Sequence, residues 1–203
     1  MRTAALLLVL LTACGRHAQP GAPPNVPHTV AVLPPNNRTG DPLLVTGASF
    51  LERYATHGPR LTVADVLAGE SRAQLERRGF DVVPDDKVDD AVHGRTPGSA
   101  EAAAEIARHG DLHGAVLYLE VRRWDPDAPT HPAFVVVGLD AAIVDVDSGK
   151  VLWSLGRAAQ PVATPGEVTL GAAYATAARK VMNEILASLG PERDRPRRER
   201  KRR

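Results

Sequence analysis

The chain has 203 residues, with 25 Lys and Arg against 24 Asp and Glu, so its formal net charge is +1. Its only cysteine is Cys14, which excludes an internal disulfide, so the folded part must be stable by packing alone. About 160 residues lie between the two tails, enough for one hydrophobic core, and we therefore expect one domain.

The first 13 residues have the pattern of an export signal. Arg2 is followed by an apolar run over 4–11, which is shorter than the roughly 20 residues that a membrane-spanning helix needs and is typical of a signal peptide. The sequence Leu11-Thr12-Ala13-Cys14 resembles the bacterial lipobox. That resemblance implies cleavage before Cys14, a diacylglycerol on its sulfur and an acyl chain such as palmitate on its new amino terminus. An ordinary cleavable signal and a buried structural cysteine are the alternatives.

Two tails flank the predicted domain. Residues 14–28 contain the lipidated cysteine and a tether of four prolines and two glycines, which is typical of an extended linker. Residues 191–203 form a basic tail with eight basic and three acidic residues, which leaves the rest of the chain mildly acidic. The tail is expected to be disordered and either solvated without a partner or in contact with anionic lipid or peptidoglycan. The candidate contacts are Arg197, Arg198, Arg200, Lys201, Arg202 and Arg203.

Within the domain, 29–190, the amino-terminal half is predicted to alternate strands and helices. An apolar strand over Thr29–Leu33 ends at two prolines, and a turn-rich loop follows over Asn36–Pro42. A helix is expected over Thr62–Arg78, where the Thr62 and Asp65 spacing predicts a capping box. The pattern of the segment 43–60 fits either a hairpin or an irregular excursion. It is also a candidate assembly loop.

A short strand is predicted over Phe80–Val83, and the acidic run 85–90 is expected to lead into a loop. A second helix should begin after Ser99 and end at Gly110.

The carboxyl-terminal half predicts antiparallel strands and a final helix. Strands are expected over Ala115–Trp124 and Phe134–Val146, and the turn Asp147-Ser148-Gly149 should lead into a strand over Lys150–Leu155. The final helix is expected to begin after Thr164 and to end at Gly190. Its apolar stripe contains Val168, Ala172, Ala175, Met182, Ile185, Leu186 and Leu189. The fold class is therefore α/β, with a single mixed sheet of about five strands and about three helices.

Four segments carry a family resemblance: VAVLPPNNRTGDP (30–42), RAQLERRGFDVVP (72–84), GAVLYLEVRRWD (114–125) and AAIVDVDSGKVLW (141–153). In this order they resemble a family of bacterial surface lipoproteins that includes a neisserial lipoprotein antigen. They also resemble the amino-terminal domain of TolB and the wider group of CsgG, PelC and LpoB. The resemblance implies an envelope protein without a catalytic site, acting as an accessory of an export or transport assembly. Activation of a cell-wall synthase and binding of a small ligand are the alternatives.

Several residues suggest chemistry, but each has a plainer interpretation. His109 and His113 are spaced for a metal ion on a helix, yet Gly110 should end that helix and spoil the shared face. The run from Asp145 starts like a calcium loop but lacks its later ligands, so a hairpin turn explains it better. The start of a nucleophile elbow at 47–51 lacks the required second glycine. Neither a metal site nor a cofactor beyond the lipid on Cys14 is expected.

Three aromatic residues, Tyr118, Trp124 and Trp153, are candidate partner contacts because aromatic residues make up only 4% of the chain. Packing in the core is the alternative for each ring. We expect a non-enzymatic lipoprotein that is anchored in the outer membrane and faces the periplasm, with the cell surface as the alternative. Gly15 follows the cysteine and favours the outer membrane, because in enteric bacteria an Asp at this position often retains a lipoprotein at the inner membrane. The protein would bind other envelope proteins or itself, and its export argues against nucleic acid as a partner.

Overall fold

A computed structural model describes residues 25–44 and 62–191. The order of the elements along the chain is β1 (Thr29–Val32), β2 (Asn36–Asn37), α2 (Val63–Arg77), β3 (Asp81–Val82), α3 (Asp85–Val92), α4 (Ala100–His109), β4 (Ala115–Pro126), β5 (Phe134–Asp145), β6 (Val151–Ala163), α5 (Leu170–Leu186) and the 3-10 turn η1 (Ala187–Leu189).

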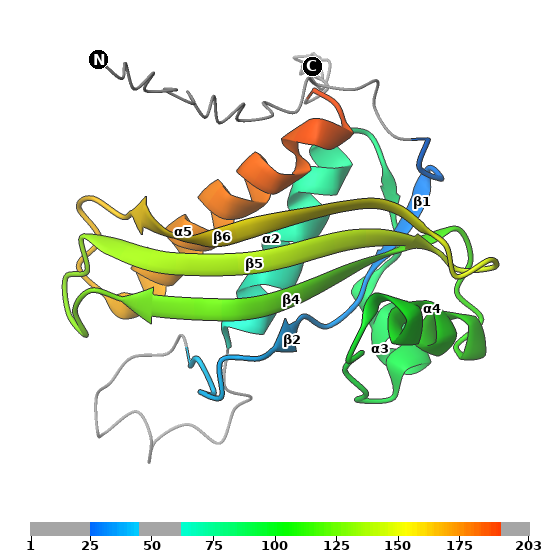
Figure 1. Ribbon diagram of the computed structural model, residues 1–203, viewed down its shortest axis with the longest axis horizontal. Coiled ribbons are helices and arrows are strands. Elements are labelled where there is room, and N and C mark those ends of the chain that lie inside the picture. Colours follow the sequence, from blue (N-terminus) through cyan, green and yellow to red (C-terminus); the bar gives the residue numbers. More distant parts are fainter. Residues whose placement is uncertain (1–24, 45–61, 192–203) are drawn as a thin grey trace, which may run out of the picture.

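The strands form one mixed sheet in the order β3-β1-β4-β5-β6 (Figure 1). β1 pairs in parallel with β3 and with β4, whereas β4, β5 and β6 are antiparallel. The predicted α/β class and mixed sheet are confirmed. The described sheet has six strands because β2 also pairs with β4, at Glu120 and Val121. The segment that contains β2 was predicted as a loop, since asparagines rarely form strands.

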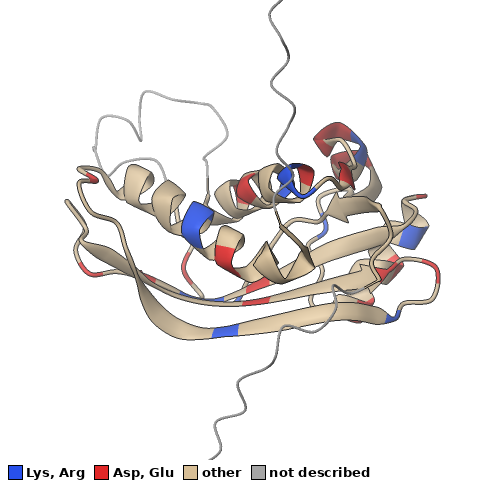
Figure 2. Ribbon diagram, turned by 90° about the horizontal axis from the view of Figure 1, so that it is seen from above, with Lys and Arg blue, Asp and Glu red and all other residues tan. Residues whose placement is uncertain are grey.

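One face of the sheet is covered by α2 and α5. In β4, Leu117, Leu119 and Val121 point to this face and share one apolar cluster with the buried sides of α2 and α5. The alternation along each strand directs every second side chain into this layer, as expected for a half-buried sheet. Most of the apolar core lies here, between the sheet and the helices that Figure 2 shows stacked along one side of it.

The other face is covered only in part. α3 and α4 pack over one end of the sheet, where they bury residues such as Leu33, Val116 and Val144. Figure 1 shows these two helices gathered at that end, while the long middle stretch of β4, β5 and β6 carries no helix on the same side. The uncovered part of this face is called the open face below.

The predicted helix signals at α2 and α4 are confirmed. The Thr62 hydroxyl accepts from the Asp65 amide, and the Asp65 carboxylate accepts from the Thr62 amide, which completes the capping box. Ser99 caps α4 with a single hydrogen bond, in which its hydroxyl accepts from the amide of Ala102. Gly79 follows α2 with a φ of 86°, a left-handed conformation that glycine adopts without a steric penalty.

The acidic run 85–90 was expected to lead into a loop, and this is wrong, because these residues begin the helix α3. Val88, Ala91 and Val92 recur at helical spacing and are buried against the sheet, while Asp85 and Asp86 occupy the first turn. Carboxylates are favourable there because the helix dipole is positive at its amino end. The run was not predicted as a helix because four of its six residues are acidic, but it forms most of a short amphipathic helix.

The predicted start of the last helix at Thr164 is also wrong. β6 continues to Ala163, the Thr164 hydroxyl donates to the carbonyl of Pro132 at 2.8 Å, and the cap of α5 is Thr169. Val168 therefore precedes the helix and is 63% exposed. The later part of the stripe is confirmed, since Met182, Ile185, Leu186 and Leu189 are all buried.

Candidate functional site

The residues of the predicted anchor and tail lie outside the described part of the chain. These are Cys14 with its lipobox residues Leu11, Thr12 and Ala13, and the six basic residues from Arg197 to Arg203. Most of the segment 43–60 is outside it as well, although its described flanks lie together, with the Val63 amide donating to the Leu43 carbonyl at 2.9 Å. None of the helices in the described ranges is long and apolar enough to cross a membrane.

Two of the three aromatic candidates are core residues and cannot contact a partner in this conformation. Trp124 is 1% exposed and meets Tyr174 edge to face, with ring centroids 5.8 Å apart. Tyr118 is 6% exposed, and its hydroxyl donates to Glu120 at 2.8 Å and accepts from Asn36 at 3.3 Å. Burial raises the pKa of the Tyr118 phenol. The core-packing alternative is therefore correct for both rings.

Trp153 is different, because it lies half-buried on β6 at the edge of the sheet. Its indole N–H donates to the Ser188 hydroxyl at 3.1 Å, and one side of its ring packs on the core. It remains a candidate for partner contact.

The two predicted histidines each have a neighbour of their own. His109 Nδ1 lies 2.7 Å from the Glu105 carbonyl, and His113 lies beside the exposed Asp111 at 3.6 Å. Gly110 caps α4 between them, as expected. Across residues 25–44 and 62–191, no three His, Cys, Asp or Glu side chains are grouped to hold a metal ion.

The turn interpretation is confirmed at Asp145. Its carboxylate accepts from the hydroxyl and the amide of Ser148, and these two hydrogen bonds lower the pKa of Asp145. The adjacent Gly149 has a φ of 68°, which closes the turn between β5 and β6.

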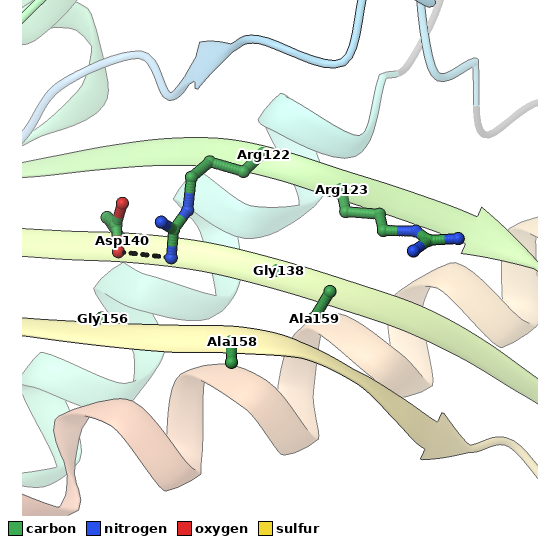
Figure 3. Close-up of a pocket in the computed structure, with 7 residues that line it drawn as sticks. All are labelled: Arg122, Arg123, Gly138, Asp140, Gly156, Ala158 and Ala159. Atoms are coloured by element: carbon green, nitrogen blue, oxygen red, sulfur yellow. Dashed lines mark ion pairs between the residues drawn. The ribbon is translucent and has the colours of Figure 1, made fainter.

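The open face holds a shallow hollow of about 600 Å³ (Figure 3). Two arginines of β4, Arg122 and Arg123, flank it, and Asp140 of β5 lies at one end. The Arg122 guanidinium is 2.8 Å from the Asp140 carboxylate, and the Arg123 guanidinium is 2.6 Å from Asp125. Only small residues make the floor, namely Gly138, Gly156, Ala158 and Ala159.

Backbone irregularities and glycines produce this hollow. The register shifts between Val121 and Arg123 on β4, so both consecutive arginines reach the open face instead of alternating. A side chain at Gly156 would place its Cβ 2.8 Å from Asp140 Oδ1, and one at Gly138 would lie 3.3 Å from the Arg123 Cβ. The two glycines therefore let the charged side chains lie flat across the sheet.

The charges of the hollow are accessible rather than sequestered. The Arg122 and Asp140 side chains are 47% and 38% exposed, and an ion pair with such exposure contributes only about 0–1 kcal/mol to stability. Arg122 and Asp140 can therefore form ion pairs with another molecule instead of with each other at little cost in free energy. A broad, open surface with exchangeable charges suits contact with a macromolecule better than enclosure of a small ligand. Sequence reasoning missed this surface, and its one signal was the pair Arg122-Arg123 interrupting an apolar strand.

Comparisons with known proteins are informative only at the level of structure. No protein-family model and no curated protein sequence matches the chain. Among solved structures, the PelC dodecamer from Paraburkholderia phytofirmans is similar with a TM-score of 0.50 and 20% identity, over 83% of this chain and 93% of that chain. The protein therefore has a fold similar to that of PelC. The fold expected from the resemblance is confirmed.

Two further structures are similar at lower scores. Lipoprotein GNA1162 from Neisseria meningitidis has 19% identity and a TM-score of 0.45, over 69% of this chain and 83% of that chain. LpoB from E. coli has 17% identity and a TM-score of 0.42, over 80% of this chain and 82% of that chain.

Proposed function

We propose that the protein is a non-enzymatic, lipid-anchored lipoprotein on the periplasmic face of the outer membrane, acting through protein–protein contacts as an accessory of an export or transport assembly. The signal pattern over 1–13 and the lipobox that ends at Cys14 support the anchor. Two or more acyl chains hold a protein stably on a membrane, whereas one chain does so only marginally. The Pro-rich tether over 14–28 gives the domain reach away from the lipid.

The open face is the observation that carries the proposal. It leaves the central part of three long strands without a helical layer, and its hollow is flanked by arginines with half-exposed side chains. A protein partner can pack on the glycines and alanines of its floor and form ion pairs with the arginines beside it.

Self-assembly is a part of the same proposal. PelC, which has the same fold, is a dodecamer in its solved structure. We propose that this chain also associates with copies of itself, and that the basic tail over 191–203 adds a weaker contact with anionic lipid or peptidoglycan.

Capture of partners from living cells tests the proposal. Three forms of the full lipidated chain would be purified after mild crosslinking: the unchanged chain, Ala158→Arg on the open face, and Ala187→Arg on the exposed surface of η1. The unchanged chain and Ala187→Arg should bring down the same envelope proteins, and Ala158→Arg should lose them. Equal capture by all three forms, each present at the same level in the membrane, would contradict the role of the open face.

The anchor has a separate test. The intact mass of protein extracted from membranes should correspond to a chain that begins at Cys14 and carries lipid, and Cys14→Ser should leave the membrane fraction. An unmodified chain that begins at another residue would refute the anchor.

A further inference from the structure

The outer edge of β6 has a protected half and an unprotected half. Among the described residues, β6 pairs only with β5, so the other edge of this 13-residue strand faces outward (Figure 1). An edge of this length is a template for pairing with another strand, and proteins usually protect such edges.

The second half, 157–163, is protected by a side chain and by proline. The carbonyl of Ala163 accepts from the Lys180 ammonium of α5 at 2.7 Å. Pro161 has no N–H to donate. The register also shifts between Val137 and Leu139, opposite this half, which bends the strand.

The first half, 151–156, also has one register shift, which leaves Leu152 without a partner residue on β5. It contains no proline, and within the described structure no side chain is bonded to its backbone carbonyls. Val151 is 39% exposed, and Trp153 and Leu155 are half-buried against the core below α5. The segment VLWSLG carries no charge, so a second strand could approach it without burying an unpaired ion.

We propose that Val151–Gly156 pairs antiparallel with the same segment of a second copy, with the two-fold axis at Ser154. This inference rests on the proposed function, because it specifies one contact of the proposed self-assembly. A two-fold interface places the same patch on both sides and must be complementary to itself. In this register Trp153 lies opposite Leu155 of the second copy, on the side covered by α5, and Ser154 lies opposite Ser154. An aromatic ring beside an aliphatic side chain is a favourable cross-strand pair.

Strand length and charge both favour a second copy as the occupant. The pairing covers the unprotected residues. It ends where Arg157, the first residue of the protected half, lies opposite Val151, the first residue of the strand. Lys150 then lies beside the second copy's Glu184, whose carboxylate is 62% exposed and 3.3 Å from the Arg157 guanidinium. The two-fold axis repeats this attraction of opposite charges twice.

A single cysteine at the axis tests the pairing. The full chain with Cys14→Ser has no other thiol, so Ser154→Cys and Ala159→Cys would each be its only cysteine. Cysteines at 154 would lie opposite one another, within the Cα separation of up to about 7 Å that a disulfide requires. Cysteines at 159 would be five residues from the axis on each strand, about 34 Å apart.

Under mild oxidation at micromolar concentration, Ser154→Cys should form a disulfide-linked dimer at least about tenfold faster than Ala159→Cys, because only the former has the required geometry. Equal rates at the two positions, or no dimer from either, would overturn the inference. A lysine at 154 would oppose itself across the axis, so Ser154→Lys should be monomeric by light scattering where Val168→Lys, at an exposed position before α5, still associates. A Ser154→Lys protein that associates as Val168→Lys does would overturn it as well.

The outcomes separate this inference from the proposed function. If Ser154→Cys fails to link but Ala158→Arg still loses envelope partners, the edge pairing is wrong and the proposed function stands. If the dimer forms while all three forms capture the same partners, the edge pairing stands and the open face has no partner.

Discussion

The stability of a Trp124→Ala protein tests whether Trp124 is a core residue or a partner-contact residue. Trp124 is 1% exposed, lies in the layer between the sheet and α5, and packs edge to face on Tyr174. Truncation of a fully buried Trp costs about 3–5 kcal/mol of stability. The lost aromatic pair accounts for about 0.5–1.5 kcal/mol beyond the buried area.

Trp124→Phe refines this expectation. The indole Nε1 of Trp124 is buried and has no hydrogen-bond partner among the described residues. A buried unpaired donor is unfavourable by about 1–3 kcal/mol, so replacing it with an apolar ring offsets part of the lost packing. Trp124→Phe should therefore destabilise the protein by less than half as much as Trp124→Ala.

Urea unfolding followed by far-UV circular dichroism measures both variants, since their fluorescence would differ from that of the unchanged chain. Trp153→Ala is the matched control: its half-buried ring has less area to lose, so its effect should be smaller than that of Trp124→Ala. A Trp124→Ala protein that unfolds within about 1 kcal/mol of the unchanged chain would refute the placement of Trp124 in the core.

Three further predictions concern the hollow, the buried phenols and the tail. Gly156→Ala places a Cβ 2.8 Å from Asp140 Oδ1 and should displace that carboxylate; urea unfolding should change by less than about 1 kcal/mol, as for an exposed ion pair, while partner capture falls, and a large destabilisation would contradict this. Burial raises the pKa of Tyr118 and of Tyr174, so their contribution to stability is complete below the ordinary phenol pKa of about 10 and is lost as the pH rises through the higher folded values. Stability measured against alkaline pH should fall less steeply in Tyr174→Phe than in the unchanged chain, and an identical slope would count against it. Deletion of 191–203 should weaken salt-sensitive binding to vesicles of anionic lipid, and equal binding with and without these residues would eliminate the contact.

Local signals predicted most of the fold. The capping box at Thr62, the cap at Ser99 and the turn at Asp147 each involve residues close in sequence, so their pattern is readable without the tertiary structure. The misjudged elements depend on distant contacts. β2 forms because β4 extends past β1 and offers backbone groups with which residues 36–37 can pair. α3 is stabilised as a helix by the burial of Val88 against the sheet.

The start of α5 shows the same limit. Thr164-Pro165-Gly166-Glu167 has the residues of a helix start, but the Thr164 hydroxyl is taken by the carbonyl of Pro132 at the end of the preceding loop. The real cap, Thr169, has the same chemistry and a better position. A local pattern can therefore predict the existence of a helix and still misplace its first residue by one turn or more.

The candidate site was the least predictable part. Tyr118 and Trp124 were candidate contact residues because aromatic residues are rare in this chain. Side-chain alternation along β4 and its register shift instead place Tyr118 in the core beneath α3 and α4, and Trp124 in the core beneath α2 and α5. Arg122 and Arg123 reach the open face through that same irregularity. Which face of a strand remains uncovered depends on where helices distant in sequence pack, and no local pattern encodes this.

Site-specific photocrosslinking at position 158 in living cells tests the central claim most directly, with position 187 as the control. The proposal predicts that a photoreactive residue at 158, on the open face, forms a discrete adduct with an identifiable envelope protein, and that one at 187 does not. Adducts at 187 but none at 158, in cells that contain both forms equally, would contradict the claim that the protein works through contacts at the open face.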